Sequence, residues 1–365
     1  MSRSSAAARS NPAPSPSSPP PLPIPRVAIV GAGRAGLSLA TALAHAGVAV
    51  DLIGRNPGRR PGAADWLRRC SADLAERDRP FGPVCLFDSV DHWDAADRRD
   101  AASPAPPTST IVVATADRDL AASAVGLGAT RRGRAADCWL HLSGVTVPSV
   151  LDAPGAPAAL ASCHPLCCLA DPLAFDPALS GEAAVALATR PLRGAFFALA
   201  GSDVVGRSRA ASVAELVGGM PALLDLAGRS NYHGAAAIVG NDLVALIAIG
   251  EDRAVAAGVS RLAARRGLLH LARTALDALE AASLDSAGSL AHGLTGAVGR
   301  GDAATIARHL DAFAEAPEAV ATHRLLSSVL VALVTDAGLI DASAQRALAE
   351  VLAVAPDSGV ASRKA

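Results

Sequence analysis

The sequence Val-Ala-Ile-Val-Gly-Ala-Gly-Arg-Ala-Gly-Leu-Ser-Leu-Ala at residues 27–40 decides the fold of this chain. Its four leading apolar residues predict a buried parallel strand, and the Ala- and Leu-rich pattern predicts a helix that runs on to Ala46. Three glycines lie between them in G-x-G-x-x-G spacing, and a second apolar segment follows at residues 48–53. This context predicts a dinucleotide site rather than an ordinary strand-to-helix turn. The phosphates would lie on the amides and the positive dipole end of the helix, at Gly31, Ala32, Gly33, Arg34, Ala35 and Gly36.

The end of the second predicted strand indicates which dinucleotide is bound. An acid about 20 residues after the glycines binds the ribose 2′-hydroxyl of NAD, whereas an arginine suits the 2′-phosphate of NADP. Arg55 and Asn56 occupy this position, and Arg59 and Arg60 follow closely. A planar guanidinium matches a phosphate well, so we expect NADP rather than NAD. The alternative is a solvated basic loop.

Composition excludes several classes of partner. The 365 residues carry a formal net charge of −1, which gives no basic footprint for nucleic acid. Six irregularly spaced cysteines make no disulfide framework and fit a reducing, cytoplasmic setting. Residues 1–25 are rich in Ser, Pro and Ala without an apolar core, which predicts a disordered tail, with a transit peptide as the alternative.

Polar residues follow two further predicted strands of the first domain. Residues 111–116 read as a buried strand, after which Thr115, Ala116 and Asp117 would border the adenosine or ribose. Asp117 alone could instead cap the next helix. A strand at 139–142 would place His141 and Ser143 near the nicotinamide, because ligands of open α/β sheets lie at the carboxyl ends of strands.

The segment Ala-Ser-Cys-His-Pro-Leu at residues 161–166 contains a candidate catalytic histidine. The following proline biases His164 toward an extended conformation, in what we expect to be a loop that could close over the site. His164 would act as a general acid/base or bind substrate, and a structural loop histidine is the alternative. The nearby cysteines lack a partner pair at metal-ligand spacing, so no metal site is expected.

Helices replace the alternating pattern in the second half of the chain. Two more strands, at 195–200 and 222–227, would complete the first sheet. We therefore expect an N-terminal Rossmann-like doubly wound α/β sheet followed by an all-α domain. The predicted divisions are a tail at 1–25, the dinucleotide-binding domain at 26–228, the helical substrate and dimerisation domain at 229–355, and a tail at 356–365.

Three polar residues of the helical domain are candidate site residues. His233 and Asn241 lie eight residues apart on one long apolar helix and could line one groove, or could make an ordinary interhelical hydrogen bond. Residues 234–250 are slightly short for a bilayer and are interrupted by Asn241 and Asp242, so we expect a buried core helix and no membrane span. Arg300, in a glycine-punctuated link, could clamp a substrate carboxylate or simply lie in a surface turn.

Several motifs together resemble one family. The chain is similar to proteins that join a Rossmann-like domain to a helical domain of unknown function (2520), a branch of the group of 6-phosphogluconate dehydrogenase-like and ketopantoate reductase-like proteins. The matching segments are Val-Gly-Ala-Gly-Arg-Ala-Gly at 30–36, His-Leu-Ser-Gly at 141–144, His-Pro-Leu at 164–166, Tyr-His at 232–233 followed by Asn241, and Leu-Thr-Gly-x-x-x-Arg-Gly-Asp at 294–302.

The resemblance implies a cleft between the domains with the nicotinamide at its base, a C-terminal domain like that of 6-phosphogluconate dehydrogenase, and a homodimer formed through the helical domain. The His164-Pro165 pair is similar to the His-Pro of prephenate dehydrogenases, whose histidine contacts substrate. The chain also departs from its relatives. Ile238 aligns with the lysine of β-hydroxyacid dehydrogenases, and the only lysine, Lys364, lies in the tail, which excludes lysine-assisted proton transfer.

These observations predict reversible hydride transfer between NADP(H) and a small oxo or hydroxy acid, as in ketopantoate reductases. His164 or His233 would donate the proton, Asn241 and Ser143 would hydrogen-bond the carbonyl oxygen, and Arg300 would bind the carboxylate. Two alternatives stay open: a prephenate dehydrogenase-like enzyme, and a protein that binds the nicotinamide cofactor without turnover.

Overall fold

The computed structural model describes residues 22–54, 56–72, 81–96, 108–283 and 289–353. The chain divides into two compact units, residues 1–240 and residues 241–365. The first unit is built on a β-sheet, and the described part of the second contains helices only. The predicted fold class, a Rossmann-like sheet followed by a helical region, is confirmed.

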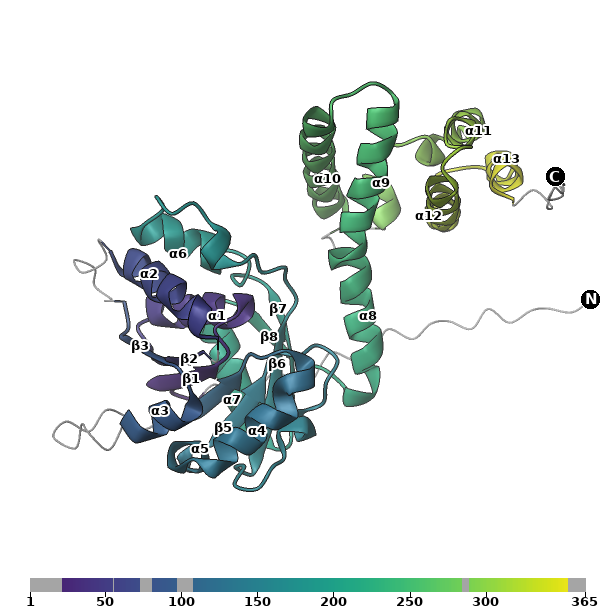
Figure 1. Ribbon diagram of the computed structural model, residues 1–365. Coiled ribbons are helices and arrows are strands. Elements are labelled where there is room, and N and C mark those ends of the chain that lie inside the picture. Colours follow the sequence, from purple (N-terminus) through teal and green to yellow (C-terminus); the bar gives the residue numbers. More distant parts are fainter. Residues whose placement is uncertain (1–21, 55, 73–80, 97–107, 284–288, 354–365) are drawn as a thin grey trace, which may run out of the picture. The chain divides into compact units, whose positions relative to one another are not determined.

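One eight-stranded sheet forms the centre of the first unit, in the order β3-β2-β1-β4-β5-β6-β7-β8 (Figure 1). Strands β1 to β6 run parallel, β7 runs antiparallel to β6, and β8 runs parallel to β7. The strand order reverses between β1 and β4, which is where doubly wound sheets bind their ligands. The strands are β1 (Arg26–Val30), β2 (Ala49–Ile53), β3 (Val84–Phe87), β4 (Thr110–Val113), β5 (Cys138–His141), β6 (Ala159–Pro165), β7 (Phe196–Gly201) and β8 (Met220–Leu223).

Helices cover both faces of this sheet, as the alternation of side chains along each strand requires. In β1, Val27 and Ile29 pack into the core under α1, α2, α6 and α7, whereas Ala28 and Val30 pack into the core under α3 and α4 (Figure 1). The helices of the first unit are α1 (Arg34–His45), α2 (Arg60–Ser71), α3 (Val90–Ala96), α4 (Leu120–Ala129), α5 (Arg131–Ala135), α6 (Gly181–Thr189) and α7 (Val204–Leu216), and α8 (Arg229–Gly240) leads away from the sheet (Figure 1).

The expected loop around His164 is wrong, because residues 159–165 form strand β6. This strand bonds to β5 on one side and to β7 on the other, so ladder hydrogen bonds hold a segment whose proline suggested a loop. Pro165 is the last residue of the strand, where a missing N–H costs little. His164 is extended as predicted, but it is fixed in the sheet rather than carried on a movable loop.

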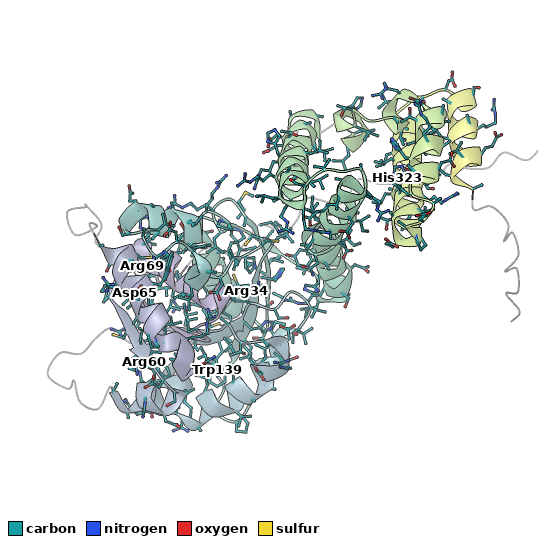
Figure 2. All side chains as sticks on the ribbon, turned by 45° about the horizontal axis from the view of Figure 1, so that its top comes forward. Arg34, Arg60, Asp65, Arg69, Trp139 and His323 are labelled. Carbon is teal, nitrogen blue, oxygen red and sulfur yellow. The ribbon has the colours of Figure 1, made fainter. Side chains whose placement is uncertain are left out.

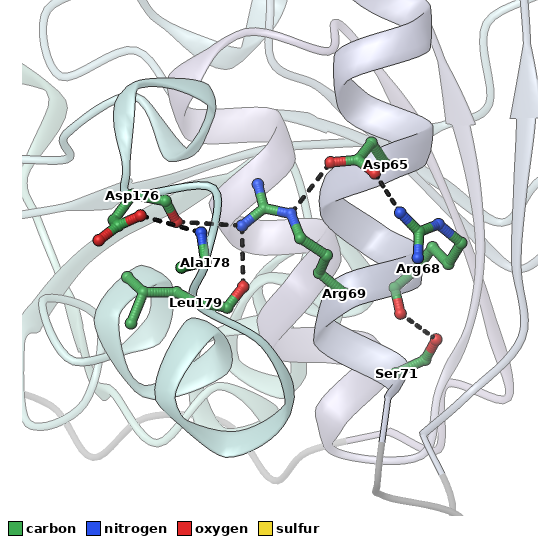
Figure 3. Close-up of polar contacts among 7 residues, drawn as sticks. All are labelled: Asp65, Arg68, Arg69, Ser71, Asp176, Ala178 and Leu179. Atoms are coloured by element: carbon green, nitrogen blue, oxygen red, sulfur yellow. Dashed lines mark hydrogen bonds and ion pairs between the residues drawn. The ribbon is translucent and has the colours of Figure 1, made fainter.

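Arg69 of α2 holds the segment that leads from β6 to α6. Its Nε donates to Asp65 Oδ2 at 3.0 Å, while Nη1 donates to the carbonyl oxygens of Leu179 at 2.8 Å and Asp176 at 3.3 Å (Figure 3). One guanidinium thus uses donors in two directions, which its planar fork allows. The segment that α2 anchors in this way includes Asp171, which pairs with Arg59 beside the glycine turn.

Asp51, in the middle of β2, is a fully buried carboxylate with three donors. Arg26 donates to Oδ1 at 2.8 Å, and Arg132 and the Trp93 indole donate to Oδ2 at 2.8 and 2.9 Å. The Arg132 guanidinium also lies over the Trp93 ring at 4.4 Å. Because burying an unpaired carboxylate is costly, this network joins β1, β2, α3 and α5.

The helices of the second unit form a pair and a three-helix group. Helices α9 and α10 pack together, and Glu251 of α9 accepts from Arg261 at 2.6 Å and from Arg265 at 2.7 Å. Ile306, Val334 and Leu348 belong to the core of the other group. The helices are α9 (Asp242–Ala256), α10 (Arg261–Ser283), α11 (Ala303–Ala312), α12 (Pro317–Asp336) and α13 (Ala342–Leu352).

The apolar helix expected to be a buried core element is exposed instead. Two helical stretches, Leu226–Ala256 and Pro317–Asp336, are long and apolar enough to cross a membrane by length and composition, which is weak evidence for a span. None of the apolar window of the first is buried, and 22% of the second is. The apolar sequence of the first stretch predicted burial, but the described residues do not bury it.

Candidate functional site

The turn between β1 and α1 is shaped by its three glycines, each for a different reason. Gly31 has a φ of +120°, and a Cβ there would lie 2.6 Å from the Ala114 carbonyl oxygen. A Cβ on Gly36 would lie 1.8 Å from the Gly31 carbonyl oxygen, so only glycine lets α1 pack this close to the turn. A Cβ on Gly33 would meet nothing within 4 Å. The space beside Gly33 is therefore free for a ligand.

Helix α1 directs the amides of its first turn toward that space. Gly33 is its N-cap, and no side chain caps the helix. The first N–H groups of a helix have no partner within it and carry its positive dipole end, so the amides of Arg34, Ala35 and Gly36 suit an anion such as a pyrophosphate. Arg34 is exposed at the start of α1 and adds a positive charge there (Figure 2). The half-buried Ala32 completes the turn.

The arginines expected to select NADP have different partners. Arg55 lies outside the described residues. The Arg59 guanidinium forms a two-pronged pair with Asp171, at 2.9 and 2.8 Å, and its Nε donates to the Ala32 carbonyl oxygen at 3.2 Å. Hydrogen bonding to Asp171 raises the pKa of Arg59 and lowers that of Asp171. Arg59 thus lies against the glycine turn, and its guanidinium is already paired with the Asp171 carboxylate.

The other residues predicted at the adenosine end have local roles in this structure. Asn56 Oδ1 accepts from the Gly58 amide at 3.0 Å, and Arg60 pairs with Asp88 at 2.6 Å. Thr115 Oγ1 lies 3.5 Å from Ser123 Oγ, and Ala116 precedes a short 3-10 turn at Asp117–Asp119. Their contact with a cofactor stays a prediction.

Asp117 does not cap the following helix, which corrects one alternative from the sequence. Its Oδ2 accepts from the Ser143 hydroxyl at 2.7 Å and from the Thr146 hydroxyl at 3.2 Å. The Thr146 amide in turn donates to Ser143 Oγ at 3.0 Å. These bonds fix the turn that follows β5 against the turn that follows β4, at the carboxyl end of the sheet.

Two histidines, His164 and His233, meet at this turn. His164 Nδ1 lies 2.9 Å from the Tyr232 hydroxyl, and the rings of His164 and His233 have centroids 5.9 Å apart. Gly144 lies between them, because a Cβ there would be 2.4 Å from His233 Cδ2 and 2.9 Å from His164 Nε2. The His-Leu-Ser-Gly segment therefore requires its glycine so that the strand end and α8 can approach.

Burial keeps the imidazoles of His141 and His164 uncharged. Desolvation, followed by electrostatic interactions with His233 and Arg229, lowers the pKa of His164 to about 4. Desolvation and Arg229 also lower the pKa of His141, again to about 4. Burial raises the pKa of the Tyr232 hydroxyl to about 12, which also keeps this group uncharged at neutral pH. At neutral pH the cluster therefore offers neutral donors and acceptors, a pattern typical of functional sites.

Arg229, the first residue of α8, also belongs to this cluster. The sequence did not identify it as a site residue, and it was expected only to begin the helical domain. Its side chain is 1% exposed, and Nη2 donates to the Ser143 carbonyl oxygen at 2.7 Å. Within the described part of the chain, Nε and Nη1 have no hydrogen-bond partner. A lone arginine after Leu-Asp-Leu-Ala-Gly gives no sign of such burial, so no sequence signal could have found it.

Asn241 and Arg300, the remaining predicted site residues, belong to the second unit. Asn241 is exposed at the start of α9, where its backbone carbonyl oxygen accepts from Val244. Arg300 is exposed, and its Nη1 donates to the Thr295 carbonyl oxygen at 2.7 Å in its own turn. Asp302, two residues later, caps α11 through the Thr305 amide. The structure gives both turns a local role, and their contact with substrate stays a prediction.

Residues 195–329 match the model of a family described as a domain of unknown function, DUF2520. Over this part of the chain the sequence is similar to DUF2520. The match begins at β7, includes α8 with Arg229, Tyr232 and His233, and ends within α12. The DUF2520 region therefore contributes half of the histidine cluster as well as most of the helical unit, and the resemblance seen in the motifs is confirmed.

Two solved structures share this architecture over most of the chain. A proposed NADP oxidoreductase from Bacteroides fragilis is 16% identical, with a TM-score of 0.57 over 84% of this chain and 98% of that one. A protein from Thermotoga maritima is 17% identical, with a TM-score of 0.56 over 86% and 99%. The likeness to both concerns the fold. No curated protein matches the sequence.

Proposed function

We propose that this protein is an NADP-dependent oxidoreductase acting on a small oxo or hydroxy acid. One observation carries the proposal: a glycine turn that leaves room for a phosphate and a cluster of neutral, partly buried histidines lie at the carboxyl edge of one sheet. The Bacteroides neighbour, described as an NADP oxidoreductase, supports the same reading.

The residues present fit a nicotinamide dinucleotide. The empty space at Gly33, which a Cβ would fill, and the amides at Arg34 and Gly36 would hold the pyrophosphate. Arg59 lies beside Ala32, where a 2′-phosphate could take the place of Asp171. When bound, the nicotinamide supplies or accepts the hydride. The protein must therefore orient the acid and move one proton.

His164 is the residue we assign to the proton. If the Tyr232 hydroxyl donates to Nδ1 at 2.9 Å, the imidazole hydrogen is on Nε2. That nitrogen faces Gly144 and can donate to an oxygen that becomes an alkoxide. Its lowered pKa keeps His164 neutral, so it stabilises the oxyanion by hydrogen bonding, and the Tyr232 hydroxyl can replace the proton it gives up. His233 and Ser143, on either side of Gly144, would orient the acid.

Stopped-flow measurement of NADPH oxidation tests this function, with ketopantoate and a panel of 2-oxo acids as substrates. We expect turnover with at least one acid. His164→Ala should slow it by about two orders of magnitude, as for loss of a general acid or base, with the NADPH dissociation constant unchanged. His92→Ala, at an exposed histidine of α3, is the matched control. Binding of NADPH without turnover of any acid would instead favour a non-catalytic cofactor-binding protein.

We also propose that the chain forms a homodimer through the helical unit. Apolar side chains on the surface of α9 and α10 are exposed, among them Val244 at 69% and Leu271 at 62%. An uncovered apolar surface of this kind is typical of an interface, and Asp242, Glu251 and Asp252 on the same hairpin oppose burial in lipid. Light scattering should give the mass of two chains, and Val244→Asp should halve it. A monomeric wild-type chain at micromolar concentration would contradict the dimer.

A further inference from the structure

Arg229 carries a buried positive charge that the described chain does not neutralise. Its side chain is 1% exposed, yet only Nη2 has a partner, the neutral carbonyl oxygen of Ser143. No carboxylate in the described ranges lies within ion-pair distance of it. The carboxylate whose charge acts on Arg229 is that of Asp117, which already accepts hydrogen bonds from two hydroxyls. Burying a charged group without a counter-ion costs several kcal/mol. A buried arginine without a counter-ion therefore indicates a functional role for its charge.

The surroundings of Arg229 place this charge at the proposed reaction centre. It holds the carbonyl oxygen of Ser143, whose hydroxyl and whose neighbour Gly144 belong to the histidine cluster. Its charge acts on His141, His164 and Tyr232, since it lowers the pKa of each of them. The guanidinium thus acts electrostatically on His164 and Tyr232, the two groups that move the proton in the proposed function.

We propose that the guanidinium of Arg229 is the group that recognises the carboxylate of the substrate, which rests on the proposed function of the same site. Nε and Nη1 have no partner and flank Nη2 on the guanidinium, so a carboxylate can pair with either of them together with the second N–H of Nη2. This assignment replaces Arg300, whose Nη1 is bound within its own exposed turn.

The ligand-free site must open for this contact to form. Neither free nitrogen of Arg229 is accessible to solvent, so the carboxylate enters as the side chain pivots about its bond to the Ser143 carbonyl oxygen or as the turn after β5 shifts. Val145, next in that turn, is 41% exposed. Gly144 has no side chain whose packing would fix the turn in place. The charge of the acid then neutralises the buried cation, which favours an anion over an uncharged analogue.

A pair of probes that differ only in charge tests the proposal. Pyruvate and its neutral methyl ester are titrated by calorimetry against the full-length chain, with and without saturating NADPH, for wild type, Arg229→Gln and Arg229→Lys. We expect wild type to bind pyruvate more tightly than the ester. Arg229→Gln should weaken pyruvate about 10- to 100-fold and leave the ester unchanged, as for loss of a charge-assisted pair. Arg229→Lys should recover part of the loss.

The control is Arg209→Gln, at an arginine of α7 that pairs with Asp137 and the Pro23 carbonyl oxygen, and it should bind pyruvate as wild type does. Equal pyruvate binding by wild type and Arg229→Gln would overturn the proposal, as would wild-type binding that does not distinguish pyruvate from its ester. If Arg229→Gln does not fold, Arg229→Lys alone must still weaken pyruvate selectively. If NADPH does not bind, the proposed function is overturned. The proposal for Arg229 is still tested in that case, because pyruvate is also titrated without the cofactor.

Discussion

Replacing Gly33 by alanine should separate cofactor binding from folding. The φ of −77° and ψ of −170° at Gly33 suit any residue, and a Cβ there would meet no atom within 4 Å. The free energy of unfolding should therefore change by less than about 1 kcal/mol, and it can rise because alanine restricts the unfolded chain. The added methyl group would nevertheless occupy the space that the structure leaves beside the first turn of α1.

The expected loss of affinity follows from the bonds that the methyl group would displace. A hydrogen bond from a backbone amide to a charged phosphate is worth about 1.5–3 kcal/mol. Displacing the pyrophosphate from one such amide should therefore weaken NADPH about 10- to 150-fold. Fluorescence titration of NADPH gives the dissociation constant, and urea denaturation gives the stability of the same preparation.

Gly36→Ala is the matched comparison, because its Cβ would lie 1.8 Å from the Gly31 carbonyl oxygen. Here α1 must move away from the turn, so we expect a loss of stability of about 1–3 kcal/mol or more, as for overpacking a core. An NADPH dissociation constant within twofold of wild type for Gly33→Ala would refute the reasoning. So would a stability loss in Gly33→Ala as large as that in Gly36→Ala.

Three further predictions follow from the described contacts. Asp51→Asn should lower the free energy of unfolding by about 3–5 kcal/mol, because it leaves Arg26 and Arg132 buried beside a neutral amide; urea denaturation measures this, and a loss below 1 kcal/mol would contradict the network. His141 and His164 both have a pKa near 4 in the folded chain against an ordinary value of 6.5, so the unfolded chain binds more protons between these pH values. Stability should therefore be complete above about pH 6.5 and fall as the pH drops toward 4, and thermal melts of His164→Asn should show a smaller fall than wild type. Asp171→Asn should free Arg59 from its ion pair and strengthen NADPH relative to NADH by up to about fivefold, as for an exposed pair; unchanged selectivity in titrations of both nucleotides would exclude Arg59 from the 2′-phosphate site.

The local sequence determined the glycine turn and the class of the fold. Gly31, Gly33 and Gly36 act on neighbours in sequence, and the strand, turn and helix around them are contiguous, so spacing alone predicts their geometry. The same holds for the buried strands, whose apolar runs are local. The segment at 159–165 was the exception, because whether a short apolar run pairs with other strands depends on what lies beside it, and Pro165 offered a competing local signal.

The tertiary structure decided which charged and polar groups meet. Arg59 and Asp171 are 112 residues apart, and Arg229 and Ser143 are 86 apart, so no spacing rule connects them. Burial also depends on packing: the sequence places an arginine at 229, but only the packed chain removes it from water and leaves two of its nitrogens without a partner. Sequence thus fixes the chemistry available at each strand end, whereas desolvation and distance, which set the charge state and affinity of that chemistry, exist only in the folded molecule.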